Sequence, residues 1–227
     1  MIEQIKINPN THTSDILFFQ EVDLTVFDNH VVPLFGPNGV GKSTFIQAII
    51  DNGTKKRQHL TLSLSDKPTT FYAYRNSTDN FKIAQPQSYE MAFDPVFMKM
   101  QWDAKSISEG QSVIYSIMGL LDIALHRDDD GNDLTIVLDE IDSGLSIDNI
   151  DVVMRKIKRI VKRGDTQFIF SFNQPRVLKW FPHVLSMYDG TKLTLHTDDD
   201  MMQEIRKHKK SFDRIRKTSK GMPKVYE

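Results

Sequence analysis

A glycine-rich stretch of nine residues, from position 36 to 44, constrains this chain more than any other part of its sequence. It has the pattern Gly-x-x-x-x-Gly-Lys-Ser/Thr of a phosphate-binding loop and consists of Gly36, Pro37, Asn38, Gly39, Val40, Gly41, Lys42, Ser43 and Thr44. The apolar run Val31 to Phe35 precedes it and a helical pattern follows it, which is the strand–loop–helix context that the motif needs. A chance glycine-rich turn would not have both neighbours. The sequence therefore predicts a site for nucleotide phosphates.

The residue types of this loop suit anion binding. Glycines let the backbone wrap tightly and turn its N–H groups inward, and the N-terminus of the following helix carries a partial positive charge. Lys42 supplies a cation for the β- and γ-phosphates, and the Ser43 hydroxyl can ligate Mg²⁺.

Composition limits the classes of protein to which the chain can belong. Its 227 residues allow one large domain or two small ones, and a formal net charge of −1 gives no overall attraction to nucleic acid or acidic lipid. The absence of cysteine excludes disulfides and thiolate metal sites. No apolar run approaches the roughly 20 residues of a membrane-spanning helix. We expect a cytoplasmic protein that does not insert into membranes directly.

Periodicity predicts an α/β protein. Strands are expected at 2–7, 16–19, 22–26, 31–35, 60–64, 69–74, 134–138, 166–172, 184–188 and 192–195, and helices after the phosphate loop and at 108–126, 147–161, 175–180 and 201–217. Residues 8–15 and 77–87 have the composition of loops, and one or two short helices are expected within 89–100. The pair Asp189-Gly190 predicts a hairpin turn between the last two strands.

Two acids follow the buried strand predicted at 134–138. Asp139 and Glu140 complete a Walker B pattern, in which the first acid holds Mg²⁺ and the second polarises the water that attacks the γ-phosphate. A buried strand that ends in two exposed acids is the alternative interpretation. A phosphate loop in the same chain favours the catalytic one.

A third motif, Ser-Ile-Ser-Glu-Gly-Gln at 106–111, lies just before the long helix predicted at 108–126. It resembles the Leu-Ser-Gly-Gly-Gln signature of the ATP-binding-cassette (ABC) ATPases in Ser108, Gly110 and Gln111, whereas Ile107 and Glu109 depart from it. Ser108 and Gln111 also form the pattern of a helix capping box, and both interpretations can hold together.

The resemblance implies a P-loop core sheet with helices on both faces, an N-terminal antiparallel β layer and a small helical lobe at about 77–125. The ATPase domain would cover 1–200, and 201–227 would form a basic C-terminal helix and tail. The family sandwiches two ATP molecules between two chains. Ser108, Gly110 and Gln111 would then complete the partner's site, while Lys42 and Glu140 act in catalysis and Ser43 and Asp139 hold the metal.

Outside the signature motif, the chain departs from the family pattern in two more places. Ser146 stands where the family's loop after Walker B has Asp, and Phe172 stands at the place of the switch histidine. Phenylalanine cannot hydrogen-bond a γ-phosphate, although Asn173 could partly substitute. We therefore expect nucleotide binding, with hydrolysis that is slower than is typical of the family.

Two residue roles known from the family each have several candidate positions in this chain. Asn76, Gln85 and Gln87 are candidates for the residue of the family's glutamine loop, and His12, Phe18 and Phe19 are candidates for the side chain that stacks on adenine. A place in the core is the more ordinary role for each aromatic side chain.

The predicted function is an ATP-hydrolysing dimer that drives or switches another protein. A short stretch between Lys42 and Ser108, and the sequence Asp-Glu-Ile-Asp at 139–142, favour a compact stand-alone ATPase over a transporter subunit. A weakly hydrolysing switch, a transporter subunit and a DNA-maintenance ATPase remain alternatives. Basic stretches at 155–163 and 206–224 are compatible with nucleic acid, but the near-neutral net charge favours solvated helix faces, and the second stretch could equally dock another protein.

Overall fold

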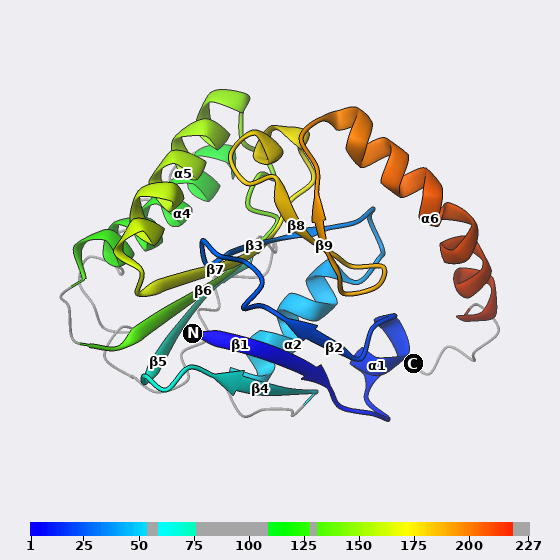
Figure 1. The fold of residues 1–227 in the computed structure, drawn as a ribbon. Helices are drawn as coiled ribbons and strands as arrows, with labels where there is room; N and C mark the ends of the chain where they lie inside the picture. The colour runs from blue at the N-terminus through cyan, green and yellow to red at the C-terminus, as the bar shows by residue number, and fades with distance from the viewer. Residues whose placement is uncertain (54–58, 76–108, 128–130, 220–227) are drawn as a thin grey trace.

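The computed structural model describes residues 1–53, 59–75, 109–127 and 131–219 (Figure 1). Its centre is a six-stranded sheet in the order β5-β6-β7-β3-β8-β9. These strands are β3 (Val31–Phe35), β5 (Thr69–Arg75), β6 (Asp133–Asp139), β7 (Thr166–Ser171), β8 (His183–Ser186) and β9 (Lys192–Thr194). The first five are parallel and β9 is antiparallel. Every residue of β3, β6 and β7 is buried, as expected where helices or strands cover both faces.

A smaller antiparallel sheet forms the second layer. Its strands are β1 (Ile2–Ile7), β2 (Glu21–Asp23) and β4 (Leu60–Leu64), in the order β2-β1-β4. In β1 the apolar residues Ile2, Ile5 and Ile7 are buried, whereas Glu3 and Lys6 are exposed. The predicted N-terminal antiparallel layer is confirmed.

Helices cover both faces of the central sheet, as predicted (Figure 1). Helix α2 (Lys42–Gly53) lies between β6 and β7 of the central sheet and β4 of the small sheet. Helices α4 (Glu109–His126) and α5 (Ile147–Ile160) pack against each other on the opposite face. Of the helical lobe expected at 77–125, residues 77–108 lie outside the described ranges, and α4 packs against α5.

Three short helices and one long helix complete the described chain. They are α1 (His12–Ile16), η2 (Val161–Arg163), η3 (Pro175–Lys179) and α6 (Asp198–Ser219). The His208 ring of α6 stacks on the Tyr188 ring, with centroids 4.3 Å apart. Within the described ranges, none of the helices combines the length and the hydropathy that a bilayer crossing needs.

The strand predicted at 16–19 is wrong, and the loop predicted at 8–15 is confirmed only for residues 8–11. A helix, α1, occupies 12–16 because Thr11 and Ser14 form a capping box, each side chain bonding the other residue's backbone. The chain beyond it has no strand before β2, which is also shorter than the predicted 22–26. Thr-x-x-Ser is a weaker form of the usual capping signal, and the polar composition of 8–15 concealed it.

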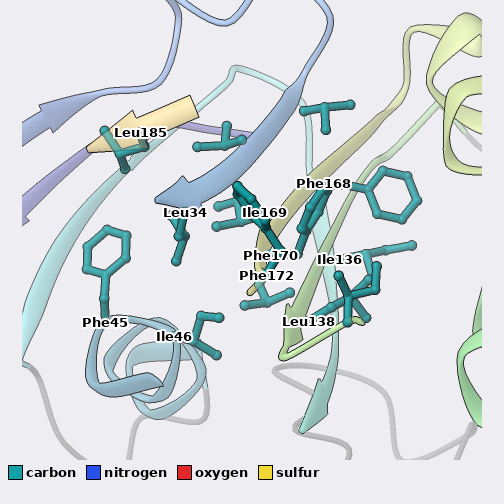
Figure 2. Close-up of a cluster of buried hydrophobic side chains, with 14 of the residues drawn as sticks. Leu34, Phe45, Ile46, Ile136, Leu138, Phe168, Ile169, Phe170, Phe172 and Leu185 are labelled. Atoms are coloured by element: carbon teal, nitrogen blue, oxygen red, sulfur yellow. The ribbon is translucent and has the colours of Figure 1, made fainter. Parts of the chain in front are cut away.

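Apolar side chains on the two faces of the central sheet and on α2 form a buried cluster that holds the layers together (Figure 2). Its labelled members come from four strands, from helix α2 and, in the case of Phe172, from the residue that follows β7: Leu34, Phe45, Ile46, Ile136, Leu138, Phe168, Ile169, Phe170, Phe172 and Leu185. All of them are buried. Each large apolar side chain buried in this way contributes roughly 1.5–3 kcal/mol, so the cluster fixes the mutual position of the sheet and α2.

One buried amide joins the two sheets. The Gln167 side chain on β7 accepts the Ile2 N–H at 2.9 Å and donates to the Ile2 carbonyl at 2.8 Å. It therefore satisfies both backbone groups of a residue in the small sheet.

We predict that Gln167→Leu lowers the free energy of unfolding by about 2–4 kcal/mol, since it leaves the N–H and the carbonyl of Ile2 buried without partners. Urea denaturation followed by circular dichroism measures the change. The control is Gln4→Leu on the neighbouring β1 strand, where the amide bonds Glu21 at the exposed side of the sheet and a change below about 0.5 kcal/mol is expected. Equal effects of the two substitutions would contradict the assigned role of Gln167.

Candidate functional site

The carboxyl ends of three neighbouring parallel strands form the site. In register, Leu34 of β3 lies opposite Ser171 of β7, and Leu138 of β6 lies opposite Phe170. Residues that follow these strands therefore emerge at one edge of the sheet, where α/β proteins bind their ligands. The phosphate loop follows β3, and the two acids predicted to be catalytic stand at the end of β6.

The loop at 36–44 has a backbone that only glycine accommodates at two positions. Gly36 has φ +154°, and a Cβ there would lie 2.7 Å from Cγ1 of Val40. Gly41 has φ +104°, and a Cβ there would lie 2.8 Å from Cδ2 of Leu17. Both distances are closer than real side-chain contacts, so the tight wrap of the loop depends on these glycines.

Lys42, the first residue of α2, folds back over the loop. Its Nζ donates to the carbonyl oxygens of Gly36 at 2.6 Å and Pro37 at 3.3 Å, and the residue is only 8% exposed. Burial lowers the pKa of the Lys42 ammonium group, while nearby carboxylates, chiefly that of Asp142, oppose the shift. The loop thus holds a cation against its own backbone.

One carboxylate oxygen connects the phosphate loop to the end of β6. Oδ1 of Asp139 accepts the Ser43 hydroxyl at 3.1 Å and the Ser171 hydroxyl at 2.6 Å. Asp139 is 4% exposed. The structure therefore brings together Ser43 and Asp139, the two residues predicted to hold a metal. A hydroxyl and a carboxylate are hard oxygen ligands of the kind that Mg²⁺ prefers, so the donor set fits that ion.

Glu140 has a backbone conformation that is rare outside glycine. Its φ is +51°, in the left-handed region. The Glu140 N–H donates to Oγ of Ser171 at 2.6 Å, and the Glu140 carbonyl accepts the Ser143 N–H at 3.0 Å. Such a conformation costs of order 1–3 kcal/mol and persists only where the surroundings enforce it, which is common at functional sites.

Ser171 was not among the predicted site residues, yet it contacts both acids. Its hydroxyl donates to Asp139 and accepts from the Glu140 backbone. Asp142, which the sequence shows only as the last residue of the Asp-Glu-Ile-Asp run, is also buried. It accepts the backbone N–H of Asn173, two positions beyond Ser171. The available signal for Ser171 in the sequence is a polar residue at the end of a buried strand.

The signature residues are only partly described. Ser108 lies outside the described ranges. Gly110 and Gln111 lie in the first turn of α4, with no side-chain description of Gln111. Their predicted contact with a partner's nucleotide stays a prediction, as do the roles of Asn76, Gln85 and Gln87, which also lie outside.

The three candidates for adenine stacking have different environments. The Phe19 ring is buried and meets the Phe45 ring edge-on, with centroids 5.7 Å apart, so it belongs to the core. Phe18 is half-buried and His12 is exposed. The segment that carries them passes the phosphate loop at Leu17, which lies against Gly41.

Phe172, at the place of the switch histidine, is a core residue. It is 2% exposed and belongs to the apolar cluster in Figure 2. The next residue, Asn173, is exposed. The side chain available at the end of β7 is therefore an amide.

The basic stretch at 155–163 divides into two sets. Lys156 pairs with Asp122 at 2.5 Å, and Arg163 donates to the Leu125 carbonyl at 3.0 Å, so these two cations tie α5 to α4. Four others are exposed: Arg155, Lys158, Arg159 and Lys162. Arg155 and Lys158 each lie 5.9 Å from the centre of the Trp180 ring. A nucleic-acid role for this face stays a prediction.

Comparison with protein families and curated proteins indicates the same similarity to ABC proteins as the motifs do. Residues 19–123 match the family model described as ABC transporter. A Bacillus cereus protein named as an ABC transporter ATP-binding protein is 21% identical over 213 residues, which cover 81% of this chain and 36% of that protein. The chain thus spans about a third of the length of this relative.

Solved structures share the fold. One described as the ATP binding subunit of an ABC transporter superposes with a TM-score of 0.57 at 13% identity, covering 91% of this chain and 100% of the other. CbiO1 from Clostridium perfringens, part of the ABC transporter complex cbiONQ, gives a TM-score of 0.52 at 17% identity, covering 95% and 98%. At these identities the likeness establishes an ABC-ATPase fold and confirms the predicted fold class.

We predict that Ser171→Ala lowers the free energy of unfolding by about 1–3 kcal/mol, because it leaves the Glu140 N–H without its acceptor and removes a donor from buried Asp139. The matched control is Ser43→Ala. It removes one longer bond to the same carboxylate from a half-buried position, and a loss below about 1 kcal/mol is expected. Chemical denaturation compares them, and a larger loss in Ser43→Ala would contradict the central place of Ser171.

Proposed function

We propose that this chain, whose family match and fold are those of the ABC-type P-loop ATPases, binds ATP with Mg²⁺ and hydrolyses it. One observation carries the proposal: Oγ of Ser43, in the phosphate loop, lies 3.1 Å from Oδ1 of Asp139, at the end of β6. Residues 96 positions apart in the chain thus supply a hydroxyl and a carboxylate at one point, beside a buried lysine.

The chain's own groups supply phosphate binding. The N-terminus of α2, a helix of 12 residues, and the N–H groups of the loop provide partial positive charge. Lys42 would exchange its two carbonyl partners for oxygens of the β- and γ-phosphates, which are stronger acceptors because they are charged. Ser43 and Asp139 would hold Mg²⁺, which when bound neutralises charge on the phosphates.

Glu140 is the residue that we assign to water activation. Its backbone is fixed by bonds to Ser171 and Ser143, and a fixed backbone limits where the carboxylate can stand. A carboxylate held at the γ-phosphate side orients the attacking water and accepts its proton, as positioned bases do in phosphoryl transfer.

The proposed working unit is an ATP-dependent homodimer. Ser108, Gly110 and Gln111 of one chain would contact the γ-phosphate bound by its partner, as the resemblance of 106–111 to the ABC signature implies. Closure on ATP and opening after hydrolysis would then move a protein partner attached to the chain.

A second candidate is the nucleotide-binding subunit of a membrane transporter. The relatives named above are transporter ATP-binding proteins, and this favours a membrane partner. Affinity purification of the tagged chain from detergent-solubilised cells tests it. A stoichiometric membrane protein in the complex would support the transporter role, and a complex made only of soluble proteins would refute it.

We predict that Glu140→Gln lowers kcat for ATP by at least about 100-fold, the usual contribution of a general base, and that it leaves ATP binding intact. In the presence of ATP, the variant should then accumulate as a dimer. Phosphate release in the steady state measures kcat, and sedimentation velocity with and without Mg–ATP measures the dimer. The control is Glu3→Gln on the exposed side of β1, which should match the wild type. Unchanged hydrolysis in Glu140→Gln would refute the assignment of the base.

A further inference from the structure

A buried carboxylate remains that the proposed mechanism does not use. Asp142 lies three positions beyond Asp139 and is 1% exposed. Its Oδ2 accepts the backbone N–H of Asn173 at 2.8 Å and also that of Gln174. Its Oδ1 has no hydrogen-bond partner among the described residues. Burying a polar oxygen without a hydrogen-bond partner is costly.

The contact between the two segments is reciprocal. The Gln174 amide Nε2 lies 3.4 Å from the Asp142 carbonyl and 3.5 Å from the Leu145 carbonyl. The loop after Glu140 and the segment after β7 are therefore joined by a side chain from each. We call these contacts of Asp142 and Gln174 the clasp. Bonds from backbone N–H groups to a carboxylate are roughly twice as strong as neutral ones, so Asp142 dominates the clasp.

The clasp fixes a segment that leaves the sheet between the phosphate loop and the Walker acids. Strand β7 lies between β3 and β6 in the sheet. At its end three successive side chains have different surroundings: Ser171 bonds Asp139, Phe172 enters the core, and Asn173 is exposed. The Asn173 amide carries two N–H donors, which a phosphate oxygen can accept.

We propose that Asp142 is a positioning residue that holds the Asn173 backbone so that the Asn173 amide contacts the terminal phosphate of bound nucleotide. The inference rests on the proposed ATPase function. Asn173 contacts the nucleotide, whereas Asp142 acts only by positioning Asn173. Burial raises the pKa of the Asp142 carboxyl, and the backbone N–H groups of Gln174 and Asn173 and the charge of Lys42 oppose that shift.

A second carboxylate holds the same segment from the other side and provides a control. Asp151 on α5 accepts Nε of Arg176 at 2.8 Å and Nε1 of Trp180 at 2.7 Å, both in or next to η3. It anchors the segment without reaching Asn173 or Gln174. A substitution at Asp151 therefore weakens the anchoring of the segment in general, whereas a substitution at Asp142 changes the position of Asn173 itself.

The experiment measures kcat and KM for Mg–ATP in five variants. Asn173→Ala and Asp142→Leu should each lower kcat by about tenfold or more, with KM within about threefold, because the lost contact serves the transition state. The double variant should be no slower than the slower single variant, since both changes remove one interaction. Asp142→Asn keeps an oxygen for the two N–H groups and should retain kcat within about threefold. Asp151→Asn should match the wild type within about twofold.

Two results would overturn the inference: an unchanged kcat in Asn173→Ala, or additive losses in the double variant. Should Asp142→Leu fail to fold by circular dichroism, Asn173→Ala and Asn173→His still decide the matter. Position 173 is exposed, and an imidazole can donate to phosphate, so Asn173→His should keep kcat while Asn173→Ala loses it. A wild type that hydrolyses ATP no faster than Glu140→Gln would instead refute the proposed function itself.

Discussion

The hydroxyl of Ser171 is the point on which the geometry of the site depends. It donates to Asp139 and accepts the N–H of Glu140, so one atom fixes the carboxylate that meets Ser43 and the unusual backbone of the next acid. That bond requires β6 and β7 to be neighbours in a defined register, and a slip of one residue would turn Ser171 to the other face of the sheet. The apolar packing of the central strands maintains that register.

A second buried network extends the same arrangement. Asp142 binds the backbone after β7, and Gln174 binds the loop after β6, so the two segments that leave the sheet beside the phosphate loop are fixed to each other. The small antiparallel sheet stabilises the assembly from the other side, through α2 and through the bonds of Gln167 to Ile2. Stability and site geometry thus share the same three central strands.

Local patterns predicted much of this structure, and long-range contacts account for what they missed. The phosphate loop, the acids after β6 and the two-sheet architecture follow from motifs and periodicity that a short window contains. Ser171 and Asp142 could not be assigned because their partners lie about 30 positions away and depend on strand register. The strand predicted at 16–19 failed because a capped helix takes in Ile16 and the next three residues form no strand. Phe172 was predicted to be unable to bind phosphate, and its burial supplies a further reason.

Calorimetric titration of the wild type and Lys42→Ala with a non-hydrolysable ATP analogue, with and without Mg²⁺, measures nucleotide binding at the phosphate loop directly. We predict that each wild-type chain binds one analogue, more tightly with Mg²⁺, and that the affinity of Lys42→Ala is at least about 100-fold weaker because the main cation of the loop is lost. Lys6→Ala, on the exposed side of β1, should bind as the wild type does. Equal affinities of wild type and Lys42→Ala, or no binding by either, would contradict nucleotide binding at the phosphate loop.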